Sequence, residues 1–173
     1  MGRPRLLLAS TLIVLLAFST RSARAQVWTN YPSYNDLASQ FLIPQNQVRA
    51  SVGEPPLVWD PTLAQYAAWY ASQREGDCAL QHSGGPYGEN IFWGAGTGWN
   101  PADAVNNWAS EAPDYDYNSN SCVDGRMCGH YTQIVWSSTT RVGCAKVVCD
   151  GEVGVFMTCN YDPPGNYVGE RPY

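Results

Sequence analysis

The stretch V-G-C-A-K-V-V-C-D-G-E-V-G-V-F-M-T-C, from Val142 to Cys159, indicates the fold class. Two runs rich in β-branched residues, Val142 to Val148 and Val153 to Cys159, flank the four residues C-D-G-E. An Asp-Gly pair between two such runs is a strong signal for a β-hairpin. We therefore expect two antiparallel strands in this part of the chain.

Upstream of this hairpin the sequence is typical of helices. A short polar side chain, alone or followed by proline, marks three helix starts, at Asp36, Asp60-Pro61 and Asn100-Pro101. Pro44 should start a new turn in the first of these helices or kink it, because proline has no N–H to donate. Helices come first and strands later, without regular βαβ alternation, which favours an α+β fold with helices packed on an antiparallel sheet.

The first residues are typical of a secretory signal. M-G-R-P-R is basic, the run from Leu6 to Phe18 is apolar but too short for a stable membrane anchor, and A-R-A at Ala23 to Ala25 fits a signal peptidase site. We expect residues 1–25 to be a signal peptide and residues 26–173 to form a single domain. The protein is then expected to be secreted.

The charge of the mature chain limits its partners. Four of the ten basic residues lie within residues 1–25, so six remain against fifteen acidic residues, a formal charge of −9. This balance argues against nucleic acid or an anionic membrane as a partner that binds through charge. It permits a cation, or a neutral lipid held by apolar contacts.

The mature chain also contains six cysteines: Cys78, Cys122, Cys128, Cys144, Cys149 and Cys159. In an oxidising compartment an even count predicts three disulfides, each worth about 2–4 kcal/mol. A zinc site is the weaker alternative, because the sequence has no C-x-x-C pair. Fifteen pairings of the six cysteines remain open at this point.

The only two histidines stand in glycine-flanked stretches: His82 opens H-S-G-G-P-Y-G-E-N, and His130 lies in G-H-Y-T-Q-I-V-W-S-S-T. The latter stretch and F-M-T-C-N-Y-D-P-P-G-N-Y, from Phe156, closely resemble the two signature motifs of the CAP superfamily. That superfamily comprises cysteine-rich secretory proteins, antigen 5 and pathogenesis-related class 1 proteins. The final R-P-Y is similar to the end of a plant class 1 protein. The resemblance covers roughly residues 35 to 173.

The resemblance implies a three-layer α-β-α sandwich with a central antiparallel sheet. It also implies a central cavity built from two histidines and two glutamates, which match His82, Glu89, Glu111 and His130 here. The family pattern pairs Cys78 with Cys149, Cys122 with Cys128, and Cys144 with Cys159. The middle bridge would then hold the segment around residues 113–122 against His130.

Two carboxylates and two imidazoles that converge can bind a divalent cation such as zinc, since the cation relieves the carboxylate repulsion. Such binding should weaken as falling pH protonates the histidines. The alternative is a hydrogen-bonded cluster that fixes the sheet to its helices without metal. The sequence requires no cofactor.

Catalysis has little support in the sequence. Members of the superfamily have been suggested to be proteases, and a histidine beside a glutamate can act as a general base. The chain contains neither H-E-x-x-H nor G-x-S-x-G, and Ser83 is adjacent to His82 only along the chain. We expect no enzymatic activity and no catalytic residue. A metal-dependent hydrolase or protease that uses the four cavity residues is the alternative.

A lipid is the favoured partner. The segment P-D-Y-D-Y-N-S-N-S-C, from Pro113 to Cys122, resembles the mobile loop that carries sterol binding in superfamily members. Tyr115 and Tyr117 alternate, so in an extended segment they would face the same side and flank a flat ring system. The alternative is an ordinary surface loop whose tyrosines pack on the domain. Withdrawal of sterol from an oomycete or fungus would explain an antimicrobial role.

The C-terminal residues suggest a second role. The resemblance implies cleavage between Asp162 and Pro163, which would release residues 163–173 as a defence-signalling peptide. That role needs a protease and a receptor as partners. The alternative is a Pro/Gly-rich segment that lies irregularly over the domain. No vacuolar extension follows Tyr173, so the cell-wall space (apoplast) is the expected location, and a monomer is the expected state.

Overall fold

The computed structural model describes residues 36–173. The expected signal peptide, residues 1–25, lies outside these residues. The described helices and strands are α1 (Leu37–Ser51), β1 (Val58–Trp59), α2 (Pro61–Gln73), β2 (Gly88–Ala95), α3 (Pro101–Ala109), the 3-10 turn η1 (Ala112–Asp114), β3 (Tyr115–Asp116), β4 (Ser121–Cys122), α4 (Gly129–Ile134), β5 (Arg141–Val148), the 3-10 turn η2 (Asp150–Glu152) and β6 (Gly154–Asp162).

The three predicted helix starts are confirmed. The carboxylate of Asp36 accepts a hydrogen bond from the third residue after it, and Asp60 caps α2 in the same way, followed by proline at the first helical position. Asn100 and Asp103 form a reciprocal capping box at the start of α3. These bonds satisfy N–H groups that have no partner inside the helix.

No separate turn begins at Pro44, because α1 continues through this residue to Ser51. Residues on both sides of the proline are anchored in the core. Phe41 and Gln45 are fully buried, and the Gln45 side chain donates to the Phe41 carbonyl. Packing of this face offsets the cost of a proline in the helix.

The sheet has the order β1-β5-β6-β2. The predicted hairpin is confirmed as the antiparallel pair β5 and β6, although β6 continues to Asp162. The connecting turn is η2, in which Gly151 has a φ of 68°, a conformation that favours glycine. β2 pairs antiparallel with β6, whereas the two-residue β1 pairs parallel with β5 and is the exception to the expected antiparallel pattern.

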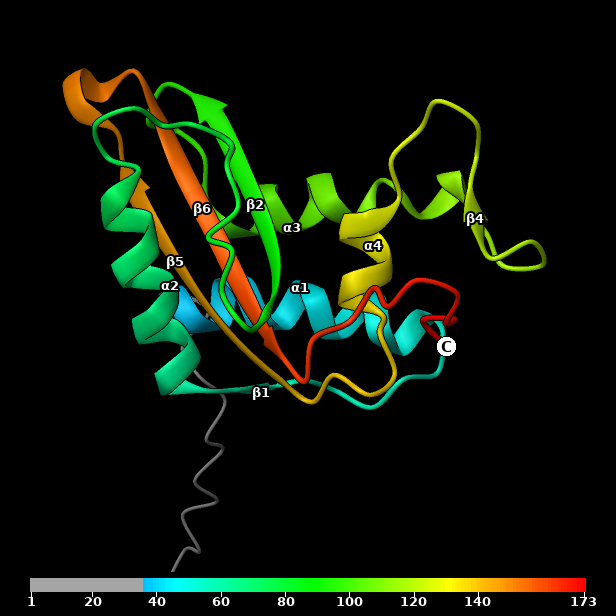
Figure 1. Ribbon diagram of the computed structural model, residues 1–173. Coiled ribbons are helices and arrows are strands. Elements are labelled where there is room, and N and C mark those ends of the chain that lie inside the picture. Colours follow the sequence, from blue (N-terminus) through cyan, green and yellow to red (C-terminus); the bar gives the residue numbers. More distant parts are fainter. Residues whose placement is uncertain (1–35) are drawn as a thin grey trace, which may run out of the picture. The chain divides into compact units, whose positions relative to one another are not determined.

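Helices cover both faces of this sheet and give the three-layer sandwich (Figure 1). On one face α2 packs against β5 and β6 through Ala67, Tyr70 and Phe156. On the other face α1, α3 and α4 enclose a larger core that includes Trp108 and Met157. Alternate residues of β6 contribute to the two cores, as expected for a strand buried on both faces. In the part of the chain that the structure describes, no helix is long and apolar enough to cross a membrane.

All six cysteines are in disulfides, and the bonded partners are those that the resemblance implies. Cys144 and Cys159 occupy directly opposite positions on β5 and β6. The other two bridges join Cys78 to Cys149 and Cys122 to Cys128. The last of these closes the segment between β4 and α4.

Candidate functional site

The four candidate cavity residues form two separate His–Glu pairs. Nδ1 of His82 lies 2.7 Å from Oε1 of Glu89, and Nδ1 of His130 lies 2.7 Å from Oε1 of Glu111. His82 belongs to the loop before β2 and Glu89 to β2 itself, while His130 lies in α4 and Glu111 follows α3. Each pair therefore connects two segments of the fold.

Glu89 is the more buried carboxylate, with 6 % of its side chain exposed. Burial opposes its ionisation, but hydrogen bonds from His82, from the Ser83 backbone and from Asn160 outweigh that cost and lower the pKa of Glu89. In return, the hydrogen bond that His82 donates to the Glu89 carboxylate raises the pKa of His82 against the opposing effect of burial. The pair is therefore stabilised in its charged form.

Glu111 has a second task besides the contact with His130. Its other carboxylate oxygen accepts hydrogen bonds from the backbone N–H groups of His130 and Tyr131, at 2.9 and 3.3 Å. These groups lie in the first turn of α4, so the carboxylate satisfies donors that the helix leaves unpaired. The His130 ring also stacks on Trp108, with centroids 6.3 Å apart. This pair fixes α4 to the end of α3.

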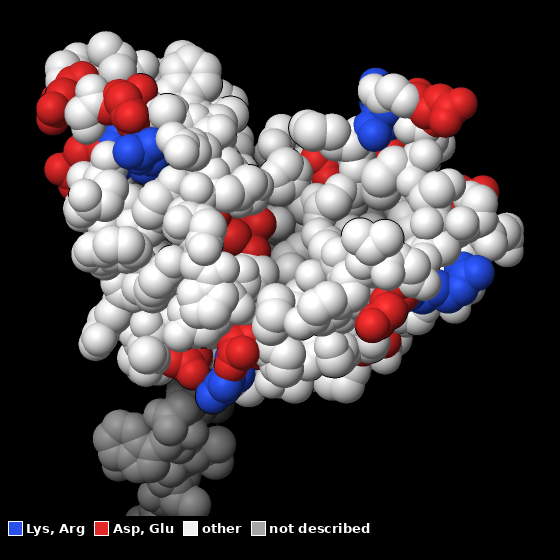
Figure 2. Space-filling model, viewed as in Figure 1, with Lys and Arg blue, Asp and Glu red and all other residues white. Residues whose placement is uncertain are grey.

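The two pairs only partly share a pocket. His82, Glu89 and His130 line a hollow of about 400 Å³, whereas Glu111 lines a neighbouring one. Figure 2 shows acidic side chains in a hollow of the face in view, amid a largely uncharged surface. Among residues 36–173 no group of three or more His, Cys, Asp or Glu side chains is placed to hold a metal ion. In this arrangement Nδ1 of each histidine contacts its own glutamate, as in a hydrogen-bonded cluster that joins the helices to the sheet.

We expect the His82–Glu89 pair to make stability depend on pH. The pKa of Glu89 is lowered in the folded protein, so this residue stabilises the fold at pH values above its ordinary pKa of 4.5. That stabilisation is lost as pH falls through the lowered pKa. The pKa of His82 is raised in the folded protein, so this residue stabilises the fold at pH values below its ordinary pKa of 6.5. That stabilisation is lost as pH rises through the raised pKa. The His82 side chain is 60 % exposed, so the effect should stay below about 1 kcal/mol.

Urea unfolding of the wild-type protein and a His82→Gln variant at about pH 5.5 and pH 9 measures this effect. The variant should lose more stability at the lower pH. An equal difference at both pH values would contradict the assignment.

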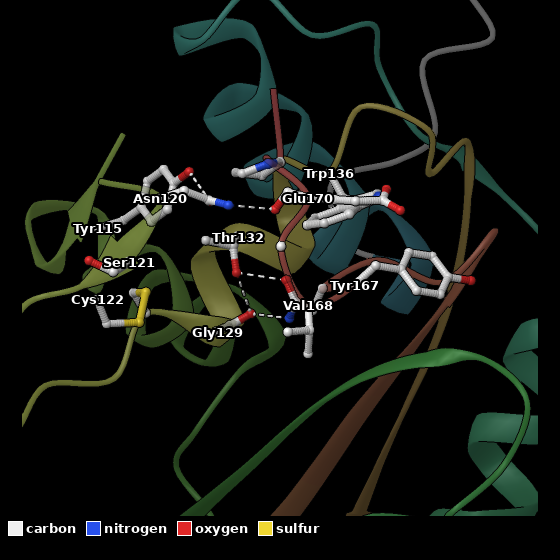
Figure 3. Close-up of a pocket in the computed structure, with 14 residues that line it drawn as sticks. Tyr115, Asn120, Ser121, Cys122, Gly129, Thr132, Trp136, Tyr167, Val168 and Glu170 are labelled. Atoms are coloured by element: carbon white, nitrogen blue, oxygen red, sulfur yellow. Dashed lines mark hydrogen bonds between the residues drawn. A yellow bond between two sulfur atoms is a disulfide. The ribbon is translucent and has the colours of Figure 1, made fainter. Parts of the chain in front are cut away.

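A second pocket, of about 350 Å³, lies between the predicted lipid loop and the C-terminal segment. We call it the loop–tail pocket. Figure 3 shows Tyr115 and Asn120 on one side, Thr132 of α4 behind, and Tyr167 and Val168 of the C-terminal segment opposite. The full lining is Tyr115, Asn120, Ser121, Cys122, Cys128, Gly129, Thr132, Trp136, Asn166, Tyr167, Val168, Gly169, Glu170 and Pro172. Glu170 is the single charged residue among them.

The two predicted lipid-binding tyrosines have different positions. Tyr115 lines the loop–tail pocket and its hydroxyl donates to Asn120, 2.8 Å away. Tyr117 lies outside the lining; its ring is 44 % exposed and stacks on Tyr173, with centroids 5.2 Å apart. The two rings meet edge to face at 88°. Of the two rings, therefore, Tyr115 alone lines this pocket.

The C-terminal segment contributes residues that the sequence did not single out. Asn166, Tyr167, Val168 and Pro172 line the loop–tail pocket, together with Trp136 just after α4. Trp136 and Tyr167 belong to the two signature motifs, but motifs that far apart give no sign that they share a pocket. The Cys122–Cys128 bridge lines both this pocket and the one with the histidines.

The predicted cleavage site is at the end of β6. The carbonyl of Asp162 accepts from the Thr140 backbone, its carboxylate pairs with Arg141, and Pro163 is exposed. The following residues, 163–173, form no helix or strand. Ser83, the hydroxyl-bearing neighbour of His82, contacts Tyr66 and Gly85 through its side chain, which places the hydroxyl in a turn rather than in a nucleophile–base pair.

A three-layer sandwich with three disulfides and two His–Glu pairs beside its sheet defines a CAP-type domain. Residues 42–161 match the family described as "CAP: Cysteine-rich secretory protein family". The chain therefore belongs to the CAP family, and within it to the plant pathogenesis-related class 1 proteins, which are defence proteins.

The similarity to curated relatives extends over most of the chain. A "Pathogenesis-related protein PR-1" from Medicago truncatula is 70% identical over 135 residues, which are 78% of each chain. "Pathogenesis-related protein PRMS" from Zea mays is 52% identical over 167 residues, 95% of this chain and 98% of the relative.

Solved structures share the fold at lower identity. Na-ASP-1 has a TM-score of 0.66 and 24% identity, and the match covers 79% of this chain but only 41% of that longer one. "NaASP2 with Zn2+" has a TM-score of 0.62 and 23% identity, over 79% of this chain and 84% of that one. At this identity the two structures support the fold alone.

Proposed function

We propose that this defence protein is secreted and binds a sterol in the loop–tail pocket. The observation that carries the proposal is the pocket itself. Tyr115, Trp136 and Tyr167 supply aromatic surface, and Val168 and Pro172 supply aliphatic surface. A volume of about 350 Å³ falls within the range of small-molecule sites, which are mostly apolar with a few polar groups.

The polar groups of the pocket are suited to one end of a sterol. Asn120, Thr132 and Asn166 can each hydrogen-bond a hydroxyl, and a sterol carries one hydroxyl on an otherwise apolar ring system. The chain's acidic charge speaks against attraction to anionic membranes, so a neutral lipid is the better match. Removal of sterol from a microbial membrane would then inhibit the microbe without any catalytic step.

A sterol that carries a photoactivatable diazirine tests this assignment in the disulfide-intact protein. After illumination, peptides that contain residues 115–122 and 166–172 should carry the label, and excess unlabelled sterol should suppress it. A suitable internal control is the groove between α1 and α3, which Val48 and Ala109 line. Competed labelling confined to that groove, or none at all, would rule out the loop–tail pocket.

Residues 163–173 are our proposal for a releasable signalling peptide. Pro163 is exposed and the segment that follows is irregular, which are the properties a protease requires. Incubation of the full chain in plant extracellular fluid should yield residues 163–173 as an intact product in mass spectrometry. Degradation without that product would contradict this role.

Neither a metal nor the hydrolase alternative enters the proposal. The similar structure of NaASP2 was solved with Zn²⁺. In this chain Nδ1 of each histidine contacts its own glutamate, and among residues 36–173 no group of three or more His, Cys, Asp or Glu side chains is placed to hold a metal ion. We assign both His–Glu pairs a structural role. The His82–Glu89 pair holds the loop before β2 in place, and the His130–Glu111 pair holds α4 in place.

A further inference from the structure

The segment proposed as a releasable peptide is also one side of the proposed sterol site. Of the loop–tail pocket's lining, the part from Asn166 to Pro172 comes from this segment. Figure 3 shows Tyr167 and Val168 across the pocket from Tyr115. Without residues 163–173 the pocket would keep the 115–122 loop and α4 but lose the side that faces them.

The first half of this segment is fixed to α4 and to the turn that follows it. The Pro163 carbonyl accepts from Thr139, and the Gly165 backbone donates to Gln133, at 2.8 and 3.1 Å. The Asn166 side chain accepts from Thr132 and donates to the Gly129 carbonyl. All of these bonds lie beyond the Asp162–Pro163 peptide bond, so a cut there would leave them intact.

The last residues of the segment are fixed to the 115–122 loop. Arg171 donates to the carbonyls of Tyr117 and Asn118, and its guanidinium lies 4.9 Å from the Tyr117 ring centroid. Tyr173 stacks on Tyr117 and meets Tyr115 edge to face, with centroids 6.3 Å apart. Asn120 donates to the Glu170 carbonyl, 3.0 Å away. Tyr117 thus does not line the pocket itself but positions residues 170–173 beside it.

We propose that sterol binding and peptide release exclude each other: a bound sterol holds residues 163–173 on the domain, and loss of these residues removes the sterol site. The inference rests on the proposed sterol site. Its physical basis is that a ligand stabilises the state it binds, here the one in which the segment is in place. By reciprocity, whatever opens the segment weakens sterol binding by the same factor.

Hydrogen exchange of the full, disulfide-intact chain tests the coupling, with dehydroergosterol, a fluorescent sterol, as the probe. At a free sterol concentration of about ten times its Kd, exchange in peptides that cover residues 165–173 should slow by roughly tenfold. Peptides from α2, on the other face of the sheet, should not change. In the Tyr117→Ala chain without sterol, exchange of the segment should become faster.

Sterol titration of two variants distinguishes the loss of contacts that position residues 163–173 from a general loss of structure. An Arg171→Ala, Tyr173→Ala double variant should bind dehydroergosterol roughly tenfold more weakly, because it loses a stacked pair and a cation–π contact. An Arg74→Ala variant, altered at the end of α2, should bind like the wild-type protein. In extracellular fluid, sterol should also lower the yield of the 163–173 peptide.

The outcomes distinguish this inference from the proposed function. If the wild-type protein does not bind the sterol, the proposed function is wrong. The wild-type protein could instead bind the sterol without a change in the exchange of residues 165–173, and the Arg171→Ala, Tyr173→Ala variant could bind it normally. The sterol site would then stand, and the inference that sterol binding and peptide release exclude each other would be wrong. Faster exchange of the segment with sterol would reverse the sign of the coupling and overturn the inference as well.

Discussion

An Arg49→Met variant should lose about 3–5 kcal/mol of unfolding free energy, which is a large part of the 5–15 kcal/mol typical of a domain. The Arg49 side chain is 1 % exposed. Its guanidinium donates to the carbonyls of Ile134 and Trp136, at 2.9 and 2.8 Å, with further bonds to the carbonyls of Pro55 and Thr139. Methionine fills much of the volume but removes these buried donors, and the Trp136 carbonyl keeps only its bond from the Thr139 backbone.

The consequences of that loss reach the loop–tail pocket. Arg49 connects α1 to the end of α4 and to the turn that leads into β5, and Trp136 in that turn lines the pocket. Glu54, 3.8 Å from the guanidinium, would also lose its charge partner. We therefore expect the variant to be weakened in sterol binding as well as in stability.

Urea unfolding followed by tryptophan fluorescence measures the effect, with an Arg126→Met variant as the control. The Arg126 side chain is 64 % exposed and pairs with Asp114 at the surface, so its replacement should have a much smaller effect on stability. Equal midpoints for the two variants would show that the buried hydrogen bonds of Arg49 do not carry the stability assigned to them.

The features that could be predicted from the sequence are the local ones. The caps at Asp36, Asp60 and Asn100 join residues at most three apart, and the Asp-Gly turn lies between two strands that are neighbours in the chain. The disulfide partners and the four cavity residues came from the family resemblance, since spacing alone left fifteen pairings open.

The features that the sequence did not indicate depend on distant contacts. Near its start β2 contains Glu89 and Asn90, which weaken its strand pattern, yet these side chains bond to Asn160, Tyr161 and the His130 carbonyl. α4 is only six residues long, and the Glu111 carboxylate supports its first turn. An arginine near a helix end normally faces solvent, so nothing in the pattern around Arg49 suggested burial.

The contact between the C-terminal segment and the 115–122 loop was also beyond sequence reasoning. Arg171 and Tyr117 are 54 residues apart, and each stands in a stretch typical of a surface loop. The two tyrosines also differ in a way that their alternation in the sequence does not indicate. Tyr115 lines a pocket, while Tyr117 packs on the chain's own Tyr173.

A Tyr115→Ala, Tyr117→Ala variant should bind sterol on the order of 100-fold more weakly, equivalent to about 3 kcal/mol, because two aromatic contacts that form or position the pocket are lost. Tyr115 contributes its ring to the lining and holds Asn120, and Tyr117 holds Arg171 and Tyr173. A Trp69→Ala variant is the matched control, since Trp69 is an exposed aromatic residue, 57 % accessible, on α2.

The measurement that tests the central claim most directly is the titration of dehydroergosterol into the wild-type protein, this double variant and the Trp69→Ala control, with folding verified by circular dichroism. The account predicts saturable binding by the wild-type protein and the control, and a loss on the order of 100-fold in the double variant. Equal affinity of all three folded proteins, or no saturable binding by the wild-type protein, would contradict it.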